Sequence, residues 1–207
     1  MIKKYFTNLM QKKTSWIIIA VLAVYFSASS FSASNPSLKE HPVKDSLVSK
    51  KAFAEVYKVL MNPRCMNCHP SGDVPLQGED SKLHTQNVKR GKDGKGLYAL
   101  KCSNCHQAEN TPGLNTPPGN PKWHLPPANM KMVFQGRSPR QLAAQLLDTK
   151  TNGNKTIPQL IEHIEKDGLV LAGWNPGEGR KLPPLSHTDF VKQFKLWINN
   201  GAYLPNK

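Results

Sequence analysis

A five-residue pattern, Cys-x-x-Cys-His, occurs twice in this chain and restricts its fold more than any other feature. The two copies use all four cysteines of the 207 residues. Cysteines three residues apart lie on the same side of a helical turn, so both thiols can reach one edge of a flat macrocycle. The histidine that follows can then bind iron, and this spacing is that of c-type haem attachment. We therefore predict two haem c groups, attached at Cys65, Cys68, Cys102 and Cys105, with His69 and His106 as proximal ligands.

The first residues have the pattern of an export signal. Four lysines precede an apolar run at 16–26, and small polar residues follow it. This order is typical of a secretory signal peptide, and the run is shorter than the roughly 20 residues of a membrane-spanning helix. We predict a signal peptide at 1–34, a polar linker at 35–45 that contains His41, and one dihaem domain at 46–207. The mature protein would be periplasmic or otherwise exported, whereas an uncleaved segment would tether it to the inner membrane.

Three other interpretations of the cysteines remain open. Zinc binds paired cysteines, but the gap from Cys68 to Cys102 is longer than in a zinc ribbon, and zinc needs no histidine after each pair. A redox dithiol usually lies between a strand and a helix, whereas Pro63 and Pro70 flank the first motif. Structural disulfides suit an exported chain with an even number of cysteines but require no histidine. The histidine that directly follows each Cys-x-x-Cys pair favours haem over these alternatives.

The charge of the chain indicates the kind of partner. Its formal net charge is +14, and loss of the four N-terminal lysines leaves the mature chain basic. Basic proteins commonly bind nucleic acid, but export argues against that partner. We expect a redox partner protein with an acidic docking surface.

Helical periodicity dominates the remaining sequence and predicts an all-α fold. Proline and glycine are frequent, and a hydrophobic content of 38% gives a small core that a buried cofactor would help to fill. We expect long Pro/Gly-rich loops at 70–96, 107–136 and 173–185. We expect a helix at 46–61 and a short helical piece at 96–101, before the second motif. A third helix is expected to begin at Pro139, after the cap Ser138, and a fourth is expected from Ile157 to Lys166, with a stop at Gly168. The last helix is expected to follow Ser186 and to end at Asn200-Gly201.

These elements resemble class I cytochrome c. The resemblance lies in a helix that runs into the first motif, a proline-rich loop, and a closing helix with Trp197-Ile198-Asn199-Asn200-Gly201-Ala202, and it covers 48–70 and 180–204 best. It implies that the first and last helices pack across each other beside a haem edge. The middle of the chain would then be an insertion that brings the second haem.

Other stretches are similar to a group of dihaem cytochromes, some of which are cytochrome subunits of isoquinoline 1-oxidoreductase-like molybdenum hydroxylases. These stretches are Asn62 to Pro70, Val88-Lys89-Arg90-Gly91, Pro117-Pro118-Gly119 and Trp174-Asn175-Pro176-Gly177. The chain departs from the class I pattern where a Met-Pro pair usually supplies the sixth iron ligand, because that place reads Lys181-Leu182-Pro183-Pro184. Leucine cannot bind iron, so the ligand comes from elsewhere or one iron is open.

Six side chains are candidates for the distal ligands. His84 lies in the loop between the motifs, and His163 lies on the helix that begins at Ile157. We favour these two, with His/His ligation of at least one haem. The alternative for His84 is a solvated loop histidine, and the alternative for His163 is a surface histidine. The remaining candidates are His187, at the start of the last helix, His124 in a Trp-His-Leu-Pro-Pro stretch, and Met130 and Met132 before a helix.

The function that these features favour is electron transfer, either as a carrier or as the electron-accepting subunit of an oxidoreductase. The alternative is a dihaem enzyme such as a peroxidase, which requires one iron with an open site and a nearby acid or base. A haem-based gas sensor would require an open iron and a signalling domain. We expect a carrier rather than an enzyme.

Overall fold

The structure is a computed structural model that describes residues 44–206. The predicted signal peptide at 1–34, and the linker at 35–45 with His41 except for its last two residues, lie outside the described residues. The described elements are α2 (Ser46–Leu60), α3 (Pro63–Met66), β1 (Leu76–Gln77), β2 (Lys82–Leu83), β3 (Gly96–Leu97), β4 (Leu100–Lys101), the 3-10 turn η1 (Cys102–Asn104), α4 (Pro139–Leu147), α5 (Ile157–Lys166), α6 (Gly168–Ala172) and α7 (His187–Asn199).

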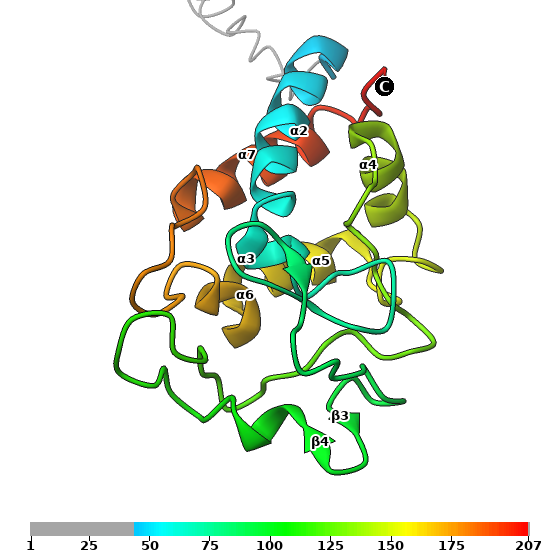
Figure 1. Cartoon of the computed structure of the whole chain (residues 1–207). Coiled ribbons are helices and arrows are strands. Elements are labelled where there is room, and N and C mark those ends of the chain that lie inside the picture. Colours follow the sequence, from blue (N-terminus) through cyan, green and yellow to red (C-terminus); the bar gives the residue numbers. More distant parts are fainter. Residues whose placement is uncertain (1–43, 207) are drawn as a thin grey trace, which may run out of the picture. The chain divides into compact units, whose positions relative to one another are not determined.

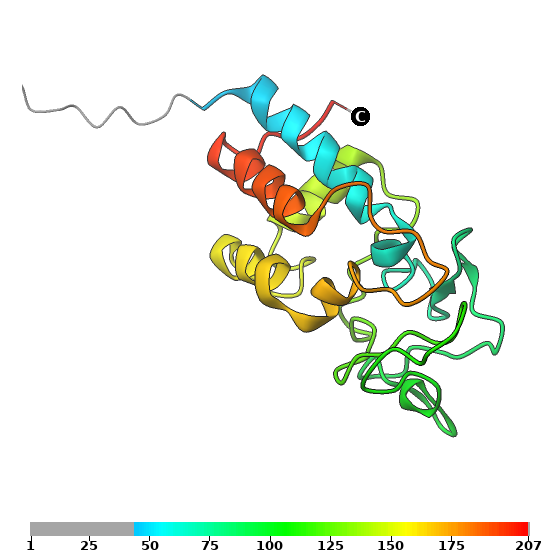
Figure 2. The same cartoon turned by 90° about the vertical axis from the view of Figure 1, so that its left-hand side faces the viewer.

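Helices α2 and α7 lie side by side and form the centre of the core (Figures 1 and 2). Each buries one apolar face, and the rings of Phe53 and Trp197 meet with centroids 4.5 Å apart. The buried hydroxyl of Ser49 donates to the carbonyl of Trp197 and accepts from the backbone N–H of Tyr203, both at 3.0 Å. The predicted packing of the first helix against the last is therefore present.

Local capping signals fix the other helices. Ser138 accepts from the backbone N–H of Gln141 at the start of α4, where proline occupies the first helical position. The expected helix from Ile157 to Lys166 is confirmed as α5. The expected end of helical structure at Gly168 is not found. Asp167 accepts from the N–H of Leu169 and so caps a further short helix, α6, which begins at Gly168.

The segment between the motifs and after the second one has almost no helix. It carries two antiparallel pairs of two-residue strands, β1–β2 and β3–β4. The prediction of a short helical piece at 96–101 is wrong, because Gly96 (φ +93) and Tyr98 (φ +50) adopt left-handed backbone that a right-handed helix excludes. Taken over residues 44–206, the regular secondary structure is mostly helical with little sheet.

Arg90 holds these loops together in place of an apolar core. Its buried guanidinium donates to the carbonyls of Gly72 and Pro126 and pairs with Asp73 at 3.6 Å. Between residues 71 and 130, only Leu76 and Leu125 are buried hydrophobic residues. In the part of the chain at 44–206, no helix has both the length and the apolar character needed to cross a membrane.

Candidate functional site

The first Cys-x-x-Cys-His motif follows α2 directly and begins within α3. Asn62 caps this short helix with its side-chain oxygen. The N–H of Cys68 donates to the carbonyl of Cys65 at 3.2 Å, and the N–H of His69 donates to that of Met66 at 2.9 Å. One continuous turn therefore carries the two thiols and the imidazole.

His69 is held on one side by a carbonyl and along its face by a ring. Its Nδ1 lies 2.7 Å from the carbonyl oxygen of Met132, and its ring stacks on Phe134 with centroids 3.9 Å apart and an interplanar angle of 8°. Burial lowers the pKa of His69 to about 4, although the Met132 carbonyl opposes this, and the charge of a protonated His163 lowers it further. The ring is therefore neutral, Nδ1 carries the hydrogen because a carbonyl only accepts, and Nε2 keeps its lone pair for a metal.

The second motif has the same arrangement on a different scaffold. The β3–β4 hairpin leads into the 3-10 turn η1, and the N–H of His106 donates to the carbonyl of Cys102 at 2.9 Å. The Nδ1 of His106 lies 2.7 Å from the carbonyl oxygen of Pro118, and the ring stacks on Trp123 with centroids 4.0 Å apart and an interplanar angle of 9°. Burial lowers the pKa of this histidine as well.

Metal-binding histidines usually donate their second ring N–H to a carbonyl or carboxylate, which fixes the tautomer and the ring orientation. Both motif histidines are held in this way. Sequence reasoning missed Phe134, Pro118 and Trp123 as partners of the motif histidines, and it named Met132 only as a possible distal ligand. A signal existed, because the proline-rich loop at 107–136 contains both Trp123 and Phe134, but the sequence does not show which ring stacks on which histidine.

The cysteines are not paired with one another. All four are free thiols in the structure, and three are at least partly buried. Burial raises the pKa of Cys65 to about 12 and that of Cys68 to about 11, and it raises the pKa of Cys102 too. A redox dithiol needs an accessible thiolate, whereas burial favours the neutral thiol. Among residues 44–206, no three His, Cys, Asp or Glu side chains lie close enough together to hold a metal ion.

His84 faces His106 across a gap. The two ring centroids lie 6.5 Å apart with an interplanar angle of 62°. Two imidazoles that bind one metal from opposite sides at about 2.0 Å have ring centres roughly 6 Å apart, so the separation suits two ligands of one iron. Burial lowers the pKa of His84, and its Nδ1 is buried with no hydrogen-bond partner in the described part of the chain.

His163 lies on α5 and is two-thirds buried. Its Nδ1 lies 3.2 Å from a carboxylate oxygen of Asp167, one turn later, which leaves Nε2 free. Burial lowers the pKa of His163, Asp167 opposes this, and the charge of His124 lowers it further. The charge of a protonated His163 also lowers the pKa of His69.

The other four candidates have less suitable surroundings. The Nε2 of His187 lies 2.7 Å from the carbonyl oxygen of Ile164, which joins α7 to α5. His124 is partly buried, with Nδ1 2.6 Å from the carbonyl of Lys122. Met132 contacts His69 through its own carbonyl, on the Nδ1 side. Met130 is partly buried. The structure thus brings His84 toward His106, and it engages His187 elsewhere.

Apolar side chains around the second motif are unusually exposed. Leu83, Tyr98, Leu100 and Leu114 are between 49% and 88% exposed, in a region with only two buried hydrophobic residues. Soluble proteins seldom leave several large apolar side chains uncovered in one segment unless something binds there.

We compared the chain with protein-family models, with curated proteins and with solved structures, and none of the three comparisons gave a match.

Proposed function

We propose that this protein is an exported dihaem c-type cytochrome that transfers electrons. The single observation that carries the proposal is the shared geometry of His69 and His106, each with Nδ1 on a backbone carbonyl and its ring stacked on an aromatic side chain. Two unrelated scaffolds have no common structural reason for this arrangement. Presentation of Nε2 to a metal explains both.

The residues present fit two haem c groups. Cys65 and Cys68 would hold the first group and Cys102 and Cys105 the second, through thioether bonds, with His69 and His106 on the irons. Haem supplies one-electron iron chemistry when it is bound. The deficit of apolar core at 71–130 and the exposed leucines of that segment support this cofactor.

A distal ligand on each group would favour electron transfer over catalysis at an open iron. We assign His84 to the second haem because of its spacing from His106. We assign His163 to the first, with Asp167 orienting its ring. His124, Met130, Met132 and His187 remain the alternative ligands. Two axial imidazoles keep the reduction potential lower than a Met/His pair does.

The excess of positive charge supports a negatively charged partner protein, such as a dehydrogenase or hydroxylase. Exposed lysines would orient docking on its acidic surface, and that attraction is screened by salt. Nucleic acid is an unsuitable partner for an exported protein.

The test is production of the mature chain in a host with a c-type maturation system, followed by intact-mass measurement and a haem stain after denaturing electrophoresis. We expect the mass of the chain plus two haems. Replacing Cys102 and Cys105 with alanine should remove one haem, and replacing Cys65 and Cys68 should remove the other. An unmodified mass, with disulfides or bound zinc, would overturn the proposal.

Spin state separates the carrier from the enzyme. Two low-spin haems in the oxidised and reduced protein support the carrier. A stable high-spin component in the wild-type protein, with peroxide turnover, would favour the dihaem enzyme instead.

A further inference from the structure

Arg64 is buried with half of its guanidinium unused. Its side chain is 6% exposed, and its Nη2 pairs with Glu79 at 2.7 Å. The other terminal nitrogen, Nη1, is buried and has no hydrogen-bond partner among the residues the structure describes. Leaving a buried charged donor unpaired costs more than leaving a neutral one, so this nitrogen indicates a missing acceptor.

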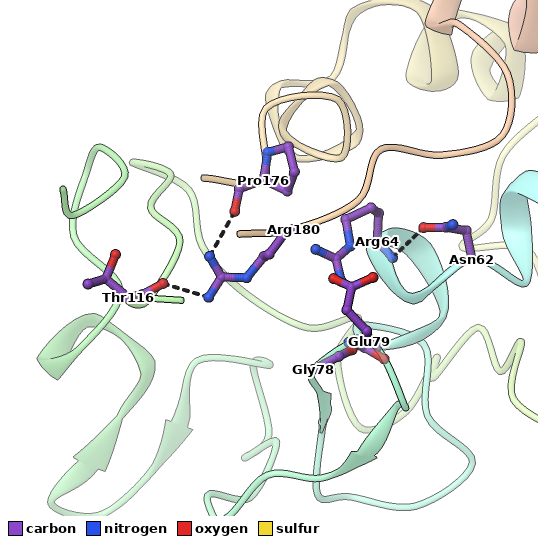
Figure 3. A network of polar contacts seen from close by, with 8 residues as sticks. Asn62, Arg64, Gly78, Glu79, Thr116, Pro176 and Arg180 are labelled. Carbon is purple, nitrogen blue, oxygen red and sulfur yellow. Dashed lines mark hydrogen bonds and ion pairs between the residues drawn. The ribbon is translucent and has the colours of Figure 1, made fainter. Parts of the chain in front are cut away.

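A second guanidinium lies beside the first. Arg180, from the loop before α7, donates to the carbonyls of Thr116 at 2.6 Å and Pro176 at 3.1 Å, as Figure 3 shows. Burial lowers the pKa of Arg180, and the charge of Arg64 lowers it further, while Glu79 opposes both. The carbonyls therefore fix the position of this guanidinium without neutralising it.

The positive charges of Arg64 and Arg180 exceed the negative charge near them. Across residues 44–206, Glu79 is the one carboxylate that pairs with either guanidinium, and its side chain is 41% exposed. Two like charges in a partly desolvated region repel each other unless a further anion lies between them. Guanidinium groups bind carboxylates particularly well because their planar fork matches two oxygens.

We propose that Arg64 and Arg180 bind a propionate carboxylate of the haem attached at the second motif, an inference that rests on the proposed function. Thioether carbons and propionates stand on opposite edges of haem c. Arg64 directly precedes Cys65, at the thioether edge of the first haem, which points away from that haem's own propionates. Arg180 donates to the carbonyl of Thr116, two residues before Pro118, whose carbonyl oxygen lies 2.7 Å from Nδ1 of His106. Arg64 therefore adjoins the first attachment site, and Arg180 contacts the loop that holds the second motif histidine.

The experiment is a potentiometric titration of the holoprotein, with two haems first verified by mass. Arg180→Gln should lower the equilibrium constant for reduction of the second haem about tenfold, or 59 mV for one electron, because a nearby positive charge favours the reduced iron. Arg180→Lys keeps the charge and should restore most of the potential. Arg137→Gln is the matched control, since Arg137 is exposed, and it should change neither potential.

The variant without Cys102 and Cys105 identifies which potential belongs to the second haem. If Arg180→Gln keeps both haems and the equilibrium constant for reduction of each haem stays within twofold of its wild-type value, the arginine assignment is overturned and the proposed function is not. A change in the potential of the first haem alone would overturn the assignment of the propionate to the second haem. Absence of haem from the wild-type protein would instead overturn the proposed function.

Discussion

In the proposed dihaem protein, replacing His84 with alanine should convert half of the haem from low spin to high spin. The magnitude follows from the geometry, because the ring centres of His84 and His106 are 6.5 Å apart, close to the separation of two imidazoles that bind one metal ion from opposite sides. Alanine cannot reach across that distance, so the iron at His106 loses a ligand. The iron at His69 keeps both of its ligands, and one haem of two changes.

His84→Met tests the same position with a ligand of different character. A thioether stabilises the reduced iron, so the potential of the second haem should rise on the order of 0.1 V, a fraction of the ~0.8 V range that axial ligands span. The assays are absorption and electron paramagnetic resonance spectra of the oxidised protein, and a potentiometric titration.

The control is His41→Ala, in the predicted linker, which should leave both spectra unchanged. His163→Ala should affect the other half of the haem. The reasoning is refuted if His84→Ala leaves both haems low spin while His124→Ala or Met130→Ala converts one of them.

Three further predictions concern stability. Phe53→Ala, in the contact between α2 and α7, should lower the free energy of unfolding by about 3–5 kcal/mol in a urea titration, and a loss below about 1 kcal/mol would contradict the packing. Arg90→Met should lower it by about 2–4 kcal/mol, because two carbonyls lose their donor, whereas the exposed Arg137→Met should have little effect. Lys131 holds the pKa of Asp73 below its ordinary 3.8, so the pair stabilises the fold above that pH and the benefit is lost as pH falls through the lowered pKa. Asp73→Asn should therefore flatten the acid limb of a stability profile, and an unchanged limb would contradict this account.

Short-range patterns in the sequence predicted the main helices well. The apolar spacing and caps of α2, α4, α5 and α7 involve residues a few positions apart, so each helix could be located from its own segment. The short piece before the second motif was mispredicted because glycine at 96 and Tyr98 take left-handed backbone, which apolar spacing does not reveal. The cap at Asp167, which starts α6, was a local signal that was overlooked.

The sequence by itself determined the chemistry available to the protein. Two motifs fix which thiols and imidazoles share a turn, since that depends on residues within five positions of one another. Only the tertiary structure decided which groups surround them. The carbonyls of Met132 and Pro118 and the ring of His84 come from outside the motifs, and chain folding alone brings such groups to the motif histidines.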